Sequence, residues 1–279
     1  MQSFGKITRP SAQLGCQFRL SAYLRGNSPH FCIMPAENQL IKYLKFKELD
    51  STQSWAHANP DSWNPQGWTA ITAGTQRQGR GSGGTAWHDV PGASLLLTLV
   101  SPPLSWSAPW VFVRHAQASL AIAEWLRAQG VSVRLKWPND VYLNDRKLGG
   151  LLTEAYWNQG RCTRWFLGLG LNVAAAPEGA AHLDGVQIEG MAEAVSAHLV
   201  SALNGPVEED TLDRYAQNLL GWQRECGFID AATGAAFRAT PRVISPDGKL
   251  GIQLDSGALR WVGHKEVIWT DWGAENAVR

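Results

Sequence analysis

The segment 131–150 constrains the fold of this chain more than any other part of its sequence. Apolar and polar side chains alternate along 131–137, which predicts a β-strand with one buried face. A tight turn at 144–145 then returns the chain as a hairpin. The sequence therefore predicts neighbouring strands that carry Lys136 and Lys147 side by side.

These two lysines bracket a Pro-Asn-Asp turn that ends in the carboxylate of Asp140, for which the sequence suggests no partner. Two cations directed at one place indicate an anion site, and a phosphate or phosphoryl group suits such a site. The alternative is that each lysine is simply solvated on the polar face of its strand. The pair, the turn and the Gly149-Gly150 that follows favour the anion site.

A glycine-rich segment at 79–84 holds four glycines in six positions, together with Arg80. Its backbone N–H groups can approach an anion closely, and Arg80 adds a cation suited to carboxylate or phosphate. The segment lacks the Gly-Lys-Ser/Thr ending of a P-loop. Because Trp87 and a strand follow it, it is not a dinucleotide-binding turn either. The alternative is a mobile surface hairpin.

Two further motifs allow both a structural and a binding interpretation. Gly168 and Gly170 weaken their strand, so either something approaches the backbone there or the sheet bends. Asn172, just beyond them, could hydrogen-bond a nucleotide. The tetrad 50–53 supplies helix-capping chemistry, but its hydroxyls could also bind a small polar head group. His88 has no partner at metal-ligand spacing, so we do not interpret it as a ligand.

Composition excludes several classes of function. A length of 279 residues allows one substantial domain and a small one. A net charge of +1 gives no broad electrostatic footprint for nucleic acid, and no apolar run approaches membrane-spanning length. Four cysteines without CxxC spacing form neither a disulfide framework nor a zinc site, which predicts a reducing, cytoplasmic location.

The predicted elements define an α+β fold. Consecutive strands joined by short turns pair antiparallel, and such strands are predicted at 131–137, 141–143, 147–157 and 163–173. Helices on one side of this mixed, largely antiparallel sheet are predicted at 53–58, 107–129, 188–204 and 208–220. We expect a poorly ordered extension at 1–44, a main domain at 45–225, and a small barrel of short strands at 226–279.

Together these motifs resemble the biotin protein ligase family, also called biotin–[acetyl-CoA-carboxylase] ligases. The resemblance covers about residues 44–272. It rests, in order, on Asp50-Ser51-Thr52, Gln76 with Gly79-Arg80-Gly81 and Trp87, Lys136-Trp137-Pro138-Asn139-Asp140, Arg146-Lys147-Leu148-Gly149-Gly150, and Gly168-Leu169-Gly170-Leu171-Asn172. It implies a catalytic domain like that of class II aminoacyl-tRNA synthetases and an SH3-like C-terminal barrel. With no DNA-binding segment expected before the main domain, it implies the monofunctional type.

The resemblance also assigns roles to residues. It implies that biotin is held by Ser51, Thr52, Gln53, Gln76, Arg80, Gly81, Ser82, Lys147 and Gly150. It implies that ATP is held by Trp87, Lys136, Asn139, Asp140, Gly168, Gly170 and Asn172, with Asp140 also serving Mg²⁺. The catalytic cations would be Arg80, Lys136 and Lys147.

The implied reaction has two steps. Biotin's carboxylate attacks the α-phosphorus of ATP, which gives biotinyl-5′-AMP and pyrophosphate, and a lysine of a biotin carboxyl carrier domain then attacks the mixed anhydride. The enzyme would be a monomer or a homodimer. One alternative is a lipoate–protein ligase, because the loop 80–89 is similar to that family's loop as well. The other is a catalytically inactive module that only binds biotin.

The glycine-rich loop departs from the pattern of many family members. Ser82 and Thr85 stand where those members carry further basic residues. We therefore predict that biotinyl-AMP is held less tightly here than in arginine-richer members, which a measurement of its release rate from the enzyme would test. Release as slow as in those members would contradict this prediction.

Overall fold

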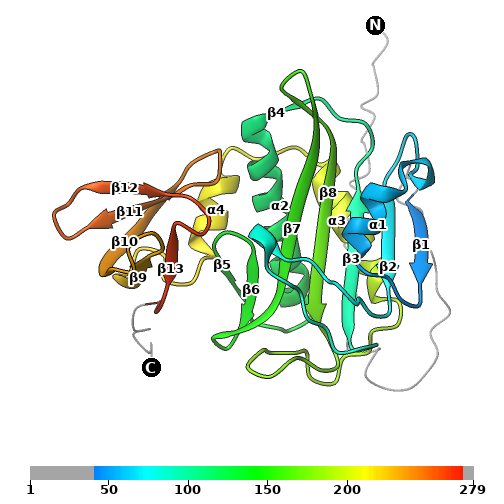
Figure 1. Cartoon of the computed structure of the whole chain (residues 1–279), viewed down its shortest axis with the longest axis horizontal. Helices are drawn as coiled ribbons and strands as arrows, with labels where there is room; N and C mark the ends of the chain where they lie inside the picture. Colours follow the sequence, from blue (N-terminus) through cyan, green and yellow to red (C-terminus); the bar gives the residue numbers. More distant parts are fainter. Residues whose placement is uncertain (1–40, 273–279) are drawn as a thin grey trace, which may run out of the picture.

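The computed structural model describes residues 41–272, so most of the extension expected at 1–44 lies outside the described residues. An eight-stranded sheet forms the larger part of the structure (Figure 1). Its strands are β1 Lys42–Phe46, β2 Thr69–Ala73, β3 Ser94–Val100, β4 Trp106–Ser107, β5 Arg134–Lys136, β6 Asp140–Leu143, β7 Arg146–Asn158 and β8 Arg161–Asn172. The order across the sheet is β1-β2-β3-β8-β7-β6-β5, with β4 paired to β8. The α+β expectation is confirmed.

Strand pairing follows the predicted turns. The four strands β5 to β8 form an antiparallel meander, whereas β1 pairs parallel to β2. Asn144 and Asp145, between β6 and β7, have φ angles of 47° and 60°. Positive φ at both central residues is the requirement of a type I′ hairpin turn, and asparagine and aspartate tolerate it. The hairpin expected at 144–145 is thereby confirmed. It joins β6 to β7, however, and β6 lies between β5 and β7, so the prediction that Lys136 and Lys147 lie on neighbouring strands is wrong.

Helices cover both faces of the large sheet, so the expectation that they lie on one side is wrong. Figure 1 shows α1 on the viewer's face and α3 behind. The helices are α1 Thr52–Ala58, α2 Ala108–Ala128, α3 Met191–Asn204 and α4 Thr211–Gln217, with short 3₁₀ turns η2 Pro60–Ser62 and η3 Ser82–Gly84.

The physical reason lies in β3, which is buried along its whole length. Leu95, Leu97 and Leu99 join the main core on the face of α2 and α3. On the other face, Val100 packs in a second core with Ala56 of α1. A strand covered on both faces reads as a continuous apolar run rather than as an alternation, so its sequence cannot show how many faces are covered.

The C-terminal part forms a separate five-stranded antiparallel sheet in the order β12-β11-β10-β9-β13. Its strands are β9 Cys226–Asp230, β10 Ala236–Ile244, β11 Leu250–Leu254, β12 Leu259–Val262 and β13 Val267–Trp269. Trp137, just after β5, donates its indole N–H to the Gly248 carbonyl at 3.0 Å and so ties the two sheets together. We propose that a domain boundary lies at 226, where this sheet begins.

Within residues 41–272, no helix is both long enough and apolar enough to cross a membrane.

The core on the α2 face predicts how stability responds to truncation. Leu99→Ala should lower the free energy of unfolding by about 2 to 5 kcal/mol, because the side chain is fully buried and would leave a cavity. Leu259→Ala is the matched control, since that leucine is 47% exposed and its loss should cost less than about 0.5 kcal/mol. Urea unfolding of both variants tests this, and equal effects would contradict it.

Candidate active site

One cavity lies between the start of α1, the middle of β7 and β8, and the glycine-rich loop. It encloses about 450 Å³, its open mouth included. Nearly all of the predicted site residues line it: Ser51, Thr52, Gln53, Gln76, Arg80, Gly81, Ser82, Trp87, Asn139, Asp140, Lys147, Gly150, Gly168 and Gly170. The sequence analysis missed the remaining lining residues, Leu97, Thr98, Leu151, Leu152 and Leu169. A lone threonine in the apolar run of β3 was the available signal for Thr98.

The start of α1 forms the closed, polar end of the cavity. Ser51 is the N-cap residue and accepts a hydrogen bond from the Ser54 N–H at 3.3 Å, which confirms the capping interpretation. Gln76 Oε1 accepts from both the backbone N–H of Thr52, at 2.7 Å, and its hydroxyl, at 3.1 Å. Thr98 donates to the Thr52 hydroxyl oxygen at 2.9 Å. Ser51 thus caps the helix, and together with Thr52 and Gln53 it lines the cavity.

Gln53 carries a buried donor at this end. Its side-chain oxygen accepts from the Thr98 hydroxyl at 3.1 Å. Its Nε2 is buried and makes no hydrogen bond of normal geometry within residues 41–272, although the amide helps to hold down the pKa of the nearby Glu154. Buried donors are rarely left unmatched, so this nitrogen needs an acceptor, which the neighbouring Glu154 or a bound ligand can supply.

The two glycines of β8 leave room for side chains that line the cavity. A Cβ atom on Gly168 would lie 2.9 Å from Gln53 Oε1. One on Gly170 would lie 2.6 Å from the indole of Trp87. The prediction that something approaches the backbone at these positions is confirmed, and any larger residue would displace Gln53 or Trp87.

Both cations on the cavity wall have carboxylate partners. Lys147 Nζ lies 2.7 Å from Asp140 Oδ1. The prediction left Asp140 without a partner and was wrong, because the register of β6 and β7 brings the two side chains together. Arg80 makes a two-pronged pair with Glu154, with Nη2 to Oε1 at 2.5 Å and Nη1 to Oε2 at 3.1 Å.

Lys136 and Asn172 do not line the cavity. Lys136 is half-buried on β5, and its Nζ lies 5.2 Å from the ring centroid of Trp272 and 5.6 Å from that of Tyr142. Burial lowers its pKa, with Asp140 opposing the shift. Asn172 is buried and donates to the Ala181 carbonyl at 3.0 Å. Of the three predicted cations, Arg80 and Lys147 line the cavity, whereas Lys136 lies outside it and interacts electrostatically with Asp140 and Lys147. Ligand roles for Lys136 and Asn172 stay predictions.

The small sheet reaches the glycine-rich loop through the turn between β12 and β13. Lys265 Nζ donates to the Gly83 carbonyl, and His264 Nε2 lies 3.5 Å from the Ser82 hydroxyl. Burial lowers the pKa of His264, and Lys265 adds to that shift. These contacts join residues 182 positions apart, so no local pattern in the sequence could show them.

Asp140 was the residue predicted to serve Mg²⁺. Residues 41–272 contain no group of three or more histidine, cysteine or acidic side chains able to hold a metal by themselves. One carboxylate at the cavity wall suits an Mg²⁺ that arrives bound to phosphates and keeps several waters, because such ions use only one or two protein carboxylates. The site fits that kind of ion and not a dedicated metal cage.

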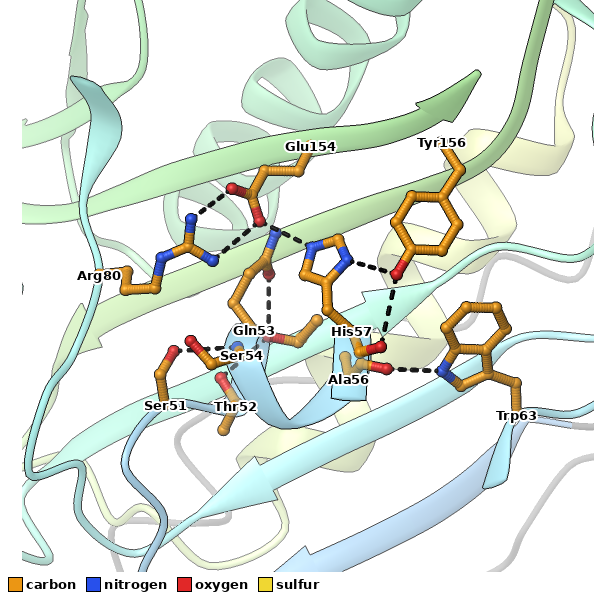
Figure 2. Close-up of polar contacts among 11 residues, drawn as sticks. Ser51, Thr52, Gln53, Ser54, Ala56, His57, Trp63, Arg80, Glu154 and Tyr156 are labelled. Atoms are coloured by element: carbon orange, nitrogen blue, oxygen red, sulfur yellow. Dashed lines mark hydrogen bonds and ion pairs between the residues drawn. The ribbon is translucent and has the colours of Figure 1, made fainter. Parts of the chain in front are cut away.

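A polar network missed by the sequence analysis lies behind the cavity wall. Figure 2 shows Glu154 of β7 between Arg80 and His57 of α1, with Tyr156 on the far side of the imidazole. His57 Nε2 lies 2.8 Å from Glu154 Oε2, and His57 Nδ1 lies 3.0 Å from the Tyr156 hydroxyl. The hydrogen bond from His57 and then the pairing with Arg80 lower the pKa of Glu154 to about 2. Glu154 is therefore an acceptor throughout the neutral range.

Comparisons with known proteins agree with this geometry. The model of the Biotin/lipoate A/B protein ligase family matches residues 45–172. The Biotin--[acetyl-CoA-carboxylase] ligase of Paracoccus denitrificans is 31% identical over 179 residues, which cover 63% of this chain and 70% of that protein. The Bifunctional ligase/repressor BirA of Bacillus subtilis is 31% identical over 132 residues, covering 46% of this chain and 39% of that protein.

A solved structure shares the fold. The biotin protein ligase from Aquifex aeolicus in complex with biotin and ATP superposes with a TM-score of 0.60 at 21% identity, over 82% of this chain and 99% of that one. The chain belongs to the biotin protein ligase family. It spans less than two thirds of the length of the bifunctional ligase/repressor relatives that it matches.

The lowered pKa of Glu154 predicts an acid-sensitive contribution to stability. Because this pKa lies near 2 in the folded protein, against an ordinary value of 4.5, the contribution is complete above about pH 4.5 and disappears as the pH falls toward 2. Allowing for partial exposure, it should be roughly 2 kcal/mol of unfolding free energy. Urea unfolding at pH 6 and pH 3 should show a smaller decrease for Glu154→Gln than for the wild type. Equal decreases would contradict the assignment.

Proposed function

We propose that this chain activates biotin with ATP, forming biotinyl-5′-AMP and pyrophosphate, and then transfers biotin to a lysine of a carrier domain. The observation that supports this most strongly is the polarity of the cavity described above. Its closed end is lined with buried hydrogen-bonding groups, and its wall toward the glycine-rich loop carries Lys147 and Arg80. A ligand with a polar head and an acidic tail suits such a cavity.

The closed end would hold the ureido ring of biotin, which has two N–H donors and one carbonyl acceptor. The hydroxyls of Ser51 and Thr52 and the amides of Gln53 and Gln76 provide both kinds of partner. The unmatched Nε2 of Gln53 is a donor for the ureido carbonyl. Between the two ends, the apolar part of biotin would lie against Leu152, which pairs with Gly168 and shares its face of the sheet.

The cationic wall would hold the reacting groups. Two anions must meet when a carboxylate attacks a phosphate, so the cations of Lys147 and Arg80 would offset their repulsion and stabilise the charge that develops. The indole of Trp87, held over Gly170, would pack against the adenylate. Asn139 and Asp140 would contact the nucleotide, and Asp140 would hold an Mg²⁺ that neutralises phosphate charge when bound with ATP.

Transfer needs no covalent enzyme intermediate. The carrier's lysine amine attacks the carbonyl of the mixed anhydride, an amide bond forms, and AMP leaves. Gly81 and Ser82 lie at the cavity wall, so the loop that contains them would shield the anhydride from water. We further propose a biotin carboxyl carrier domain as the acceptor and the cytoplasm as the location. Mass-spectrometric detection of biotin on a purified carrier domain tests the overall function.

A lipoate–protein ligase is less well supported. The loop 80–89 is similar to that family's loop, and the matching family model covers both biotin and lipoate ligases. Two of the curated relatives, from Homo sapiens and Paracoccus denitrificans, are named as biotin ligases. Formation of an adenylate from biotin but not from lipoate would exclude it. Pyrophosphate release with biotin, ATP and Mg²⁺ would exclude an inactive binding module.

Lys147→Ala should reduce adenylate formation by a factor of about 100 or more, because the variant loses a cation directed at the transferring phosphoryl group. Circular dichroism should show an unchanged fold. The matched control is Lys249→Ala, an exposed lysine in the turn before β11, which should keep wild-type activity. A pyrophosphate-release assay measures both variants, and near-normal turnover of Lys147→Ala would show that this lysine is only a surface residue.

A further inference from the structure

Glu154 contacts a cation of the cavity wall without lining the cavity itself. We propose that Glu154 is a positioning residue, which fixes the guanidinium of Arg80 at the cavity wall so that it meets the carboxylate of the bound acid. This inference rests on the proposed function, because it assumes that an acid occupies the cavity. It assigns a role to a carboxylate that the proposed chemistry does not otherwise use.

Arg80 needs such a support because its loop fixes its backbone but not its side chain. A β-bridge to Ala86 holds the backbone of Arg80, whereas its guanidinium is held by Glu154. The arginine side chain is 42% exposed and has many rotamers. Both oxygens of Glu154 engage the guanidinium, and a two-pronged pair of this kind fixes direction as well as distance.

Glu154 is itself held in place from the side opposite Arg80. Its Oε2 accepts from His57, whose ring lies 4.0 Å from that of Phe166 and 5.2 Å from that of Tyr156, centroid to centroid. These contacts belong to β7, β8 and α1, the elements that also form the cavity. The orientation of Arg80 is thereby set by the rigid sheet and helix, as Figure 2 shows, rather than by the loop.

The pair leaves Arg80 able to act on a ligand. A guanidinium has five N–H donors, and Glu154 takes one from each of two nitrogens. The remaining donors can face the cavity, of which Arg80 is a lining residue. The negative charge of Glu154 also balances the positive charge of Arg80 when no anion is bound, so the site does not accumulate unpaired cations.

A purely structural role for Glu154 is the competing explanation, because its contact with His57 also ties β7 to α1. The two roles differ in their coupling to Arg80. A residue that acts through Arg80 has no further effect once Arg80 is absent, whereas a structural tie to α1 should act independently of it.

A double-mutant cycle on the full chain separates them. We expect Glu154→Gln and Arg80→Ala each to raise the KM for biotin about tenfold, in line with the loss of a charge-assisted hydrogen bond. The double variant should match Arg80→Ala, and the KM for ATP should change less. If the double variant raised the KM for biotin about a hundredfold, which is the product of the two single effects, the proposal would be overturned. Glu193→Gln, an acidic control paired with the remote Lys45, should leave KM unchanged.

A second measurement does not depend on biotin. Amide hydrogen exchange across 79–87 should be faster in Glu154→Gln than in the wild type, because the loop loses its tie to β7. Unchanged exchange would overturn the positioning role even if the wild type were inactive. Failure of the wild type to form an adenylate would instead overturn the proposed function, so the two failures are distinguishable.

Discussion

The long antiparallel pairing of β7 with β8 is the constraint on which the rest of the structure depends. Residues from Gly149 to Asn158 pair with residues from Arg161 to Leu171. One face packs against the main core, and the other carries α1 and the glycine-rich loop. Only glycine is small enough at positions 168 and 170 to leave room for the side chains of Gln53 and Trp87. The cavity exists because these two strands lie at the centre of the sheet and because Gly168 and Gly170 carry no side chains that would fill it.

Charge is balanced within the protein before any ligand binds. Lys147 pairs with Asp140 and Arg80 pairs with Glu154, so each cation of the cavity wall has a carboxylate within hydrogen-bonding distance. Besides any contribution to stability, these pairs act on the geometry of the site. They hold two flexible side chains in defined places and reduce the repulsion between them. An anionic ligand then meets cations that are already oriented.

Much of the fold could be predicted from local patterns, and the resemblance to the family supplied most of the site residues. The burial alternation along 131–137, the turn at 144–145 and the cap at Ser51 each depend on neighbouring residues, and each is confirmed. The strand predicted over 131–137 is shorter than expected and spans only Arg134–Lys136. The prediction that all helices lie on one side of the sheet was wrong for α1. A strand buried on both faces carries no periodicity that reveals the second layer of helix. Glu154 was missed because a single acidic residue on a strand is an ordinary surface residue until its partners are known.

The sequence by itself determined which segments become strands and helices, where the hairpins turn, and which motifs supply polar, cationic and glycine residues. Only the tertiary structure decided which of these residues meet. Arg80 reaches Glu154 across 74 positions, Lys265 reaches Gly83 across 182, and Lys136 turns to Trp272 rather than to the cavity. The physical reason is that periodicity and turn chemistry act between near neighbours in the chain. Ion pairs and cavities depend on strand register and on how separate layers pack.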